Sequence, residues 1–416
     1  MIQTHVLPNG LTLIMERLPY LRSAAIGLFV KAGSMMEEAS QSGLSHFIEH
    51  MAFKGTKTKT AKQIAEEIDL IGGNVNAATS KLATSYYART TDKDLKKALF
   101  LLADMLVNPK EDAADFEKER QVILEEIAME ADSPEDLVFN LMHEGLYGDQ
   151  TLSRTILGSK QAISSYQLKD LQAFRGRFYQ PGNAVLSIAG RFIPEDVIAW
   201  AEEAFEGWAG EERLPFPENA IIKDNQVLTL DKDVEQVHLC VSFEGLPSLH
   251  DDRHALLAFT TAFGGGVSSR LFQRVREEEG LVYNIYAAPS FYPGVGELTV
   301  YAACTPKNVK KVLAIVEREK DEVIHQGLSR QEFTQTMAQV KTGFVLGMES
   351  AYQRMAGMGL NMLLHNRLIL QKDTLAQLRK VNLKTVNRVA REILSKESKL
   401  AVVGKKISKQ FQAKGA

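Results

Sequence analysis

Two histidines and a glutamate lie within five residues of an otherwise apolar run, as His46, Glu49 and His50. At 100° per residue, a helix over residues 44–53 would place these three side chains on one side. The apolar residues of the run would fall on the other side: Leu44, Phe47, Ile48, Met51 and Ala52. Histidines four residues apart on a helix can reach one metal ion, although a solvated polar face would show the same pattern.

A zinc ion needs further ligands, and a second acidic helix over residues 116–130 offers them. Glu119 and Glu126 lie seven residues apart beside the apolar stripe of this helix. A carboxylate there is costly without a positive partner. We predict that His46, His50 and Glu126 bind one Zn²⁺ ion per chain and that Glu119 orients one of these ligands. A salt bridge to the adjacent arginine or a nearby lysine would explain the periodicity equally well.

Two histidines and one carboxylate form a catalytic zinc set rather than a structural one, because they leave a coordination position for water. Glu49 lies one turn from His46 on the same face and can act as general base. It would take a proton from the water that attacks a carbonyl group and pass that proton to the leaving amine. The pattern therefore predicts metal-assisted hydrolysis of peptides.

The elements that must position these residues indicate an α+β protein, because strand-like runs alternate with helical patterns throughout the chain. Their order occurs twice, so we infer two pseudo-symmetric α/β domains, each a sheet covered by helices, from an internal duplication. The matching elements are the strands 24–30 and 237–243, the helices 44–53 and 253–265, and the late strands 183–190 and 399–404.

A linker is indicated by the glycine, proline and charge content of residues 207–217. We predict an N-terminal zinc-binding domain over residues 1–208, a linker over 209–224 and a C-terminal duplicated domain over 225–416. The second domain lacks a metal site, because only His254 occupies the position of His46 and neither base nor second histidine follows it. His254 is therefore expected to be structural.

Composition narrows the class of protein. Hydrophobic residues make up 45% and charged residues 24% of the 416 residues, as in ordinary globular proteins. The net charge of −3 gives no support to a nucleic-acid or anionic-membrane partner. No apolar run reaches the length of a membrane span, and the N-terminus lacks the pattern of a signal peptide, so we expect a cytoplasmic protein.

The spacing of His46, Glu49 and His50, with Glu126 76 residues beyond His50, resembles the inverted HxxEH zinc signature of the pitrilysin-type metallopeptidases, family M16. Glu119 matches the second glutamate of that signature. The most similar branch includes mitochondrial processing peptidase and its bacterial relatives. The resemblance extends over nearly the whole chain, with further matching segments at residues 43–56, 72–77, 179–183 and 268–272.

The resemblance implies two similar α/β domains and assigns substrate-binding residues to the second. In the family that domain supplies an arginine and a tyrosine seven residues apart, here Arg276 and Tyr283, which hold the substrate carbonyl and stabilise the oxyanion. Arg276 is expected to end a helix that Gly280 terminates, and Tyr283 to begin the following strand. Without the resemblance, Arg276 reads as a surface ion pair and Tyr283 as an ordinary strand residue.

Residues 72–80 form a polar, glycine-led strand that is weakly hydrophobic for a sheet interior. Such a strand suits a sheet edge, where an extended peptide can bind through main-chain hydrogen bonds. An edge hairpin that binds nothing is the alternative. The residues expected to bind substrate are Asn74, Val75, Asn76, Ala77 and Ala78.

These features predict a zinc endopeptidase that acts on extended peptides or unfolded segments at the cleft between two domains. Family members of this size work as paired chains that enclose a chamber, which implies a homodimer here or a heterodimer with a related subunit. A non-catalytic assembly or peptide-binding subunit is the rival hypothesis. Such subunits show decayed zinc motifs, whereas this chain carries His46, Glu49, His50 and Glu126 together.

Overall fold

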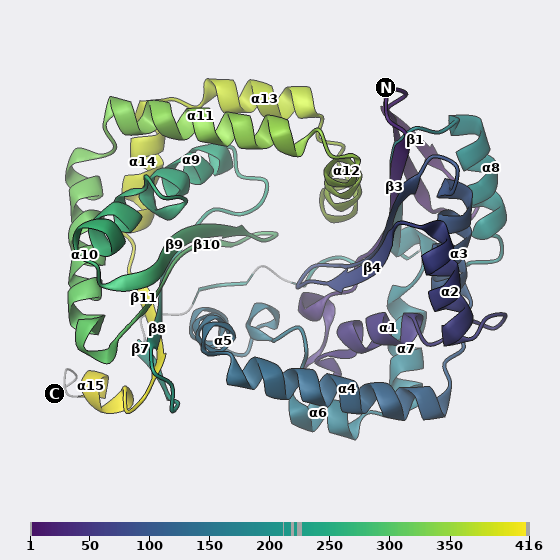
Figure 1. The fold of residues 1–416 in the computed structure, drawn as a ribbon, viewed down its shortest axis with the longest axis horizontal. Helices are drawn as coiled ribbons and strands as arrows, with labels where there is room; N and C mark the ends of the chain where they lie inside the picture. Colours follow the sequence, from purple (N-terminus) through teal and green to yellow (C-terminus); the bar gives the residue numbers. More distant parts are fainter. Residues whose placement is uncertain (1, 211, 218–219, 223–226, 413–416) are drawn as a thin grey trace. The chain divides into compact units, whose positions relative to one another are not determined.

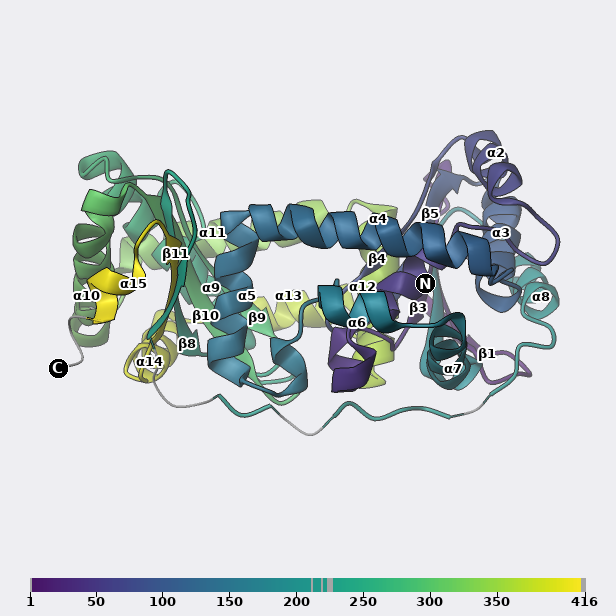
Figure 2. The same cartoon turned by 90° about the horizontal axis from the view of Figure 1, so that it is seen from below.

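The structure is a computed structural model that describes residues 2–210, 212–217, 220–222 and 227–412. These residues form two β-sheets that helices cover, as Figure 1 and Figure 2 show, and so confirm the predicted fold class. The chain divides into two compact units of three segments each. The first unit holds Met1–Ala128, Arg154–Pro217 and Leu346–Leu370, and the second holds Met129–Ser153, Glu218–Val345 and Gln371–Ala416.

The first unit is built on a six-stranded sheet in the order β1-β2-β6-β3-β5-β4. The β2–β6 pair is parallel and the other neighbouring pairs are antiparallel. Strand β6 is buried along its whole length, as its apolar sequence requires at the centre of a sheet. The strands are β1 (Ile2–Val6), β2 (Thr12–Arg17), β3 (Ser23–Val30), β4 (Asn74–Thr79), β5 (Thr84–Thr91) and β6 (Ala184–Gly190).

Strand β4 forms one edge of this sheet and pairs with β5. A Cβ atom at Gly73, directly before β4, would lie 1.9 Å from the carbonyl oxygen of Arg89. Only glycine therefore lets the chain enter the strand this close to β5. The edge position predicted for residues 72–80 is confirmed.

Helices cover both faces of the first sheet, with α12 on one face and α2, α3 and α8 on the other (Figure 1). A Cβ atom at Gly27 would lie 2.5 Å from the sulfur of Met355, and one at Gly359 would lie 2.3 Å from the ring of Phe29. Two glycines therefore allow α12 to pack closely on β3. The helices are α1 (Leu44–Ala52), α2 (Ala61–Ile71), α3 (Leu95–Val107), α6 (Lys160–Ser165), α7 (Leu168–Phe178), α8 (Pro194–Ala204) and α12 (Ala351–His365), and α4 (Ala113–Asp132) begins in this unit.

The second unit is built on a five-stranded sheet in the order β7-β11-β8-β10-β9. Its strands are β7 (Val227–Asp231), β8 (Val237–Glu244), β9 (Val282–Phe291), β10 (Gly296–Cys304) and β11 (Lys399–Gly404). Helix α5 packs on β7, β8 and β11, while α9, α10 and α14 pack together. The helices are α5 (Pro134–Tyr147), α9 (Arg253–Gly264), a π-helix (Phe272–Glu278), α10 (Val309–Gln326), α11 (Arg330–Gly347), α13 (Gln371–Lys380), α14 (Leu383–Leu394) and α15 (Ser408–Gln412).

The two sheets repeat one topology. Strands β2-β6-β3-β5-β4 of the first sheet correspond in order to β7-β11-β8-β10-β9 of the second. In both sheets the first of these pairs is parallel and the remaining three are antiparallel. The internal duplication inferred from the order of sequence elements is therefore present in the sheets, with β1 as an addition to the first.

The boundaries of the compact units differ from the predicted contiguous division at residues 208 and 225. Residues 129–153, which contain α5, belong to the second unit, and residues 346–370, which contain α12, belong to the first. Each exchanged helix covers the sheet of the other half of the sequence. Helix packing between distant segments decides this exchange, and no local pattern marks it.

The predicted linker over 209–224 falls partly outside the described residues, at 211, 218–219 and 223–224. Its described residues contain neither helix nor strand. Among the described helices, none combines the length and the hydropathy that crossing a membrane requires.

Candidate metal centre

Helix α1 separates its residues as the sequence predicts. His46, Glu49 and His50 are half-buried on one side of the helix. The apolar residues on the opposite side are buried: Leu44, Phe47, Ile48, Met51 and Ala52. The apolar side thus anchors α1 in the core of the first unit and leaves the polar side available for chemistry.

A buried carboxylate fixes the start of α1. Helix α1 follows Gly43, which has no side chain to cap the free backbone amides of the first turn. Glu37 accepts hydrogen bonds from the amides of Gly43 and Ser45, both at 2.8 Å. Its side chain therefore replaces the missing cap and places a carboxylate at the positive end of the helix dipole.

The Glu37 carboxyl makes a pH-dependent contribution to stability. Burial raises the pKa of Glu37 to about 7, although the amides of Ser45 and Gly43 and the charge of Arg154 act in the opposite direction. An unfolded glutamate titrates near pH 4.3, so between these values the folded chain binds more protons than the unfolded chain. The free energy of unfolding is therefore expected to fall as pH rises through this window, by up to about 3 kcal/mol.

Chemical denaturation of the wild type and of Glu37→Gln between pH 4.5 and 8 checks this expectation. The difference between the two pH profiles isolates the Glu37 contribution. Glu38→Gln, at an exposed neighbouring position, is the matched control and should follow the wild type. Identical profiles for the wild type and Glu37→Gln would contradict the prediction.

Three side chains from α1 and α4 converge on one point. Glu126 Oε2 lies 3.7 Å from His46 Nε2 and 3.5 Å from His50 Nε2. One potential ligand atom from each of the three lies within 4.8 Å of the others, and no further such group of histidine, cysteine, aspartate and glutamate occurs in the part of the chain that the structure describes. Atoms that share a tetrahedral zinc ion are separated by roughly 3.3 Å. The spacing therefore fits a small divalent ion.

Glu119 lies within hydrogen-bond distance of His50. Its Oε2 lies 3.1 Å from His50 Nδ1, and its Oε1 lies 2.6 Å from Lys54 Nζ. When Nδ1 donates to this carboxylate, the lone pair of His50 Nε2 faces Glu126 and is free to bind a metal. The alternative prediction, a salt bridge from these glutamates to a nearby lysine, therefore holds for Glu119, which pairs with Lys54. The adjacent Arg120 instead pairs with Glu117.

The protonation state of His46 suits a metal ligand. Burial, together with the neighbouring His50, lowers the pKa of His46 to about 4. The imidazole is therefore neutral near pH 7, which is the form that binds metals. Its Nδ1 is buried and has no hydrogen-bond partner among the described residues. A neutral histidine with Nε2 directed at a carboxylate and a second imidazole fits the donor set of zinc.

Glu49 lies beside this group with a polar partner of its own. Burial raises the pKa of Glu49, hydrogen bonding from Thr79 and the charge of His50 lower it, and Glu126 raises it further. The Thr79 hydroxyl donates to Glu49 Oε2 at 2.5 Å. A raised pKa makes this carboxylate a stronger base than an ordinary glutamate.

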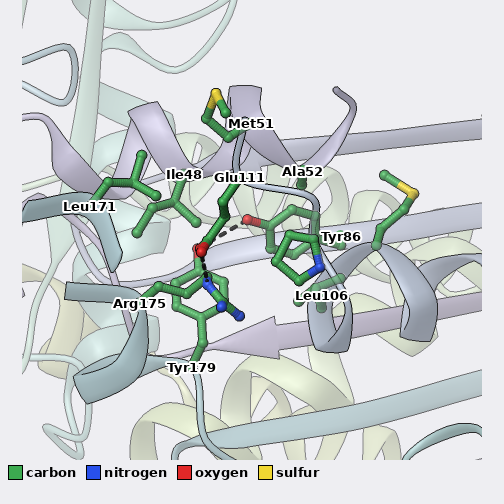
Figure 3. A pocket seen from close by; sticks show the side chains of 11 residues that line it. Ile48, Met51, Ala52, Tyr86, Leu106, Glu111, Leu171, Arg175 and Tyr179 are labelled. Carbon is green, nitrogen blue, oxygen red and sulfur yellow. Dashed lines mark hydrogen bonds and ion pairs between the residues drawn. The ribbon is translucent and has the colours of Figure 1, made fainter. Parts of the chain in front are cut away.

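The cavity in Figure 3 lies on the other side of α1 and does not reach the metal group. Ile48, Met51 and Ala52 line it from the buried side of the helix, and its volume is about 10 Å³. Such a volume suits about one water molecule rather than a peptide. Inside it the hydroxyls of Tyr86 and Tyr179 meet at 3.0 Å. The side chains that line this cavity therefore belong to the packing beneath α1 and not to a binding site.

Arg276 and Tyr283 lie together in the second unit. The Arg276 guanidinium carbon is 5.0 Å from the centre of the Tyr283 ring. The π-helix over residues 272–278 carries Arg276, and Tyr283, 77% exposed, is the second residue of β9. Gly280, with φ of +60°, makes the turn between them. The ion pair from Arg276 to Glu277 is long, at 3.9 Å, so the guanidinium is available to other partners.

The predicted substrate strand is polar and mostly accessible. Asn74, Asn76 and Ala78 are exposed, Val75 is half-buried and Ala77 is buried. The amide of Ala77 donates to the Asn76 side chain at 2.8 Å. A peptide that added to this edge at Ala77 would have to displace that side chain.

His254, expected to be structural, is largely buried in the second unit. Its Nε2 lies 2.9 Å from the Gln377 side-chain oxygen. Sequence reasoning did not identify Glu37, Lys54 or Thr79 as parts of the site. Two of them carried a signal: Thr79 lies within the edge strand predicted over residues 72–80, and a nearby lysine was an alternative partner for the glutamates of α4.

Two family profiles match the chain. The profile described as Insulinase (Peptidase family M16) matches residues 12–160, and the profile described as Peptidase M16 inactive domain matches residues 165–340. The first profile covers every residue of the metal group. The second begins in the first unit and covers much of the duplicated half.

Relatives match along nearly the whole length. A Bacillus subtilis protein named uncharacterized zinc protease YmxG is 35% identical over 403 residues, which cover 97% of this chain and 98% of the relative. A Mycobacterium tuberculosis protein named uncharacterized zinc protease Rv2782c is 36% identical over 408 residues, which cover 97% of this chain and 93% of the relative.

A solved structure shares the fold. The crystal structure of a protease from Helicobacter pylori superposes with a TM-score of 0.90 at 23% identity, over 97% of this chain and 99% of that one. At this identity the likeness concerns the fold alone. The profiles and the relatives show that the chain belongs to peptidase family M16.

Proposed function

We propose that the protein is a zinc-dependent endopeptidase that cleaves extended peptides or unfolded segments. The observation that carries this proposal is the convergence of His46, His50 and Glu126, with the carboxylate of Glu49 on the same side of α1. Family membership and relatives that are named zinc proteases support it.

The three converging side chains would hold one Zn²⁺ ion per chain. Such an ion would polarise the carbonyl group of the substrate and lower the pKa of a water molecule. Glu119 keeps His50 in the tautomer that offers Nε2, and Lys54 balances the charge of that carboxylate. Three protein ligands would leave one coordination position of such an ion for water, as hydrolysis requires.

Glu49 is proposed as the general base. It takes a proton from the attacking water and returns it to the amine that leaves. Its raised pKa favours this exchange, because a stronger base removes the proton more readily. Partial burial also keeps bulk water from competing for the carboxylate.

Two surfaces are proposed to hold the peptide. The edge strand β4 would bind its main chain through Asn74, Val75, Asn76, Ala77 and Ala78. Arg276 and Tyr283 would hold the carbonyl at the scissile bond and stabilise the oxyanion, from the same chain or from a second one. Their stacked arrangement supports this role, because the ring fixes the guanidinium in place.

The proposal extends to assembly and location. We propose a homodimer, or a heterodimer with a related subunit, in the cytoplasm. The support is the resemblance to family members of similar length that work as paired chains. Nucleic acids and membranes are not among the proposed partners.

Three measurements on one purified sample test the function. Elemental analysis should find about one zinc per chain, a quenched fluorescent peptide should be cleaved, and a chelator should abolish the cleavage until zinc is returned. Mass spectrometry of products from mixed peptides would then identify the cleavage sites. A sample that binds no zinc and cleaves nothing across a peptide library would favour the non-catalytic subunit instead.

A further inference from the structure

The carboxylate of Glu49, a residue of α1, accepts a hydrogen bond from a residue of a neighbouring strand. Thr79 is the last residue of β4, and its hydroxyl donates to Glu49 Oε2 at 2.5 Å. Helix α1 and strand β4 pack against each other in the first unit. Hydrogen bonds to a charged acceptor are stronger than those between neutral groups. This bond therefore restrains one of the two oxygens of the base.

The neighbours of Thr79 decide where its single hydroxyl hydrogen goes. Thr84, opposite it on β5, lies with Oγ1 3.3 Å from Thr79 Oγ1. The Thr84 hydroxyl donates its own hydrogen to the carbonyl oxygen of Ala32 at 2.6 Å. Since the Glu49 carboxylate is both closer than Thr84 Oγ1 and a better acceptor, the Thr79 hydrogen is committed to Glu49.

The support behind Thr79 is rigid. Thr84 and Tyr86, on the strand that pairs with β4, are fully buried. Tyr86 in turn meets Tyr179 hydroxyl to hydroxyl (Figure 3). A group that orients a catalytic side chain acts best from a regular element whose own side chains are locked by packing. Thr79 lies on a regular element, because β4 is paired along its whole length with β5, and the packed side chains are those of β5 behind it.

We propose that Thr79 is a positioning residue whose hydroxyl fixes the carboxylate of Glu49 for proton transfer. The inference rests on the proposed function. Because Thr79 ends the strand proposed to bind the peptide, one element positions both the substrate and the base. Displacement of a reacting group by about 1 Å can cost about 100-fold in rate, so the loss of this bond should lower kcat rather than raise KM.

Three variants of the full chain test the proposal. Thr79→Val keeps the shape and the β-branch of threonine but removes the donor. Thr79→Ser keeps the donor. Thr90→Val is the matched control, because Thr90 is a buried threonine of β5 whose hydroxyl donates to the Ile71 carbonyl oxygen, away from the metal group. For each we would measure kcat, KM, zinc affinity by chelator competition and the thermal midpoint.

The expected result is a 10- to 100-fold lower kcat for Thr79→Val, with KM within about 3-fold of the wild type. Thr79→Ser should restore kcat to within about 3-fold, and zinc affinity and midpoint should match those of Thr90→Val. Two results would overturn the proposal. One is an unchanged kcat in Thr79→Val, and the other is a parallel loss of zinc affinity and midpoint that serine does not restore.

A double-mutant cycle separates this inference from the proposed function. Thr79→Val and Glu49→Ala are combined in zinc-free protein, and their effects on the thermal midpoint are compared. Non-additive effects support the bond even if the wild type cleaves no peptide, which would defeat the proposed function alone. Additive effects would show that the two side chains do not interact, and would overturn the inference.

Discussion

Replacement of Glu49 by glutamine is expected to lower kcat by about 10²- to 10⁴-fold, the range that a general base contributes. Glutamine keeps the size of the side chain and an oxygen that accepts from Thr79, but it cannot take a proton from water. Zinc content should stay at one ion per chain, because the proposed ligands are His46, His50 and Glu126. Initial rates on a quenched fluorescent peptide measure the effect.

The control for this change is Glu125→Gln, which removes a carboxylate from an exposed position of α4. It should retain the activity of the wild type. If Glu49→Gln cleaved at the wild-type rate with its zinc in place, another group would have to be the base. If it lost its zinc, the side chain would belong to the ligand set.

Replacement of Glu126 by alanine is expected to remove zinc. The variant would leave two imidazoles as the protein ligands, and even the loss of an outer partner of a ligand costs about 10- to 100-fold in metal affinity. We therefore expect an affinity at least about 100-fold lower, with loss of peptidase activity. Competition with a chromophoric chelator measures the affinity directly.

The adjacent Glu125 again offers a matched control, since Glu125→Ala changes the same type of residue one position earlier. Helical geometry turns it about 100° away from Glu126, and it is exposed. Its zinc affinity should equal that of the wild type. Equal losses in both variants would mean that general negative charge, and not a ligand at Glu126, holds the ion.

The sequence predicted the arrangement of side chains well where local periodicity decides the outcome. A helix fixes which side each residue occupies, so the division of α1 into a polar and a buried side followed from spacing alone. The same reasoning placed Glu119 and Glu126 beside the apolar stripe of α4, where Glu119 is buried and Glu126 half-buried. Repetition of the element order likewise predicted the repeated topology of the two sheets.

Pairing between distant segments was not predictable in this way. The sequence left open whether Glu119 or Glu126 pairs with Arg120. In the structure Arg120 bonds instead to Glu117 and to the carbonyl oxygen of Tyr166. The sequence also offered a nearby lysine as a partner without indicating which one, and in the structure Lys54 reaches Glu119. Long polar side chains can reach several partners, and the packing of helices decides among them.

The sequence by itself determined which side chains are candidates for metal binding and proton transfer: two histidines and a glutamate on one side of a helix, and a further glutamate on another helix. Tertiary structure alone decided what supports that chemistry. It placed the Glu37 carboxylate at the start of α1 and the Thr79 hydroxyl against Glu49, and it exchanged α5 and α12 between the two units. The physical reason is range, since periodicity acts within one element, whereas these contacts require strands and helices far apart in the chain to meet.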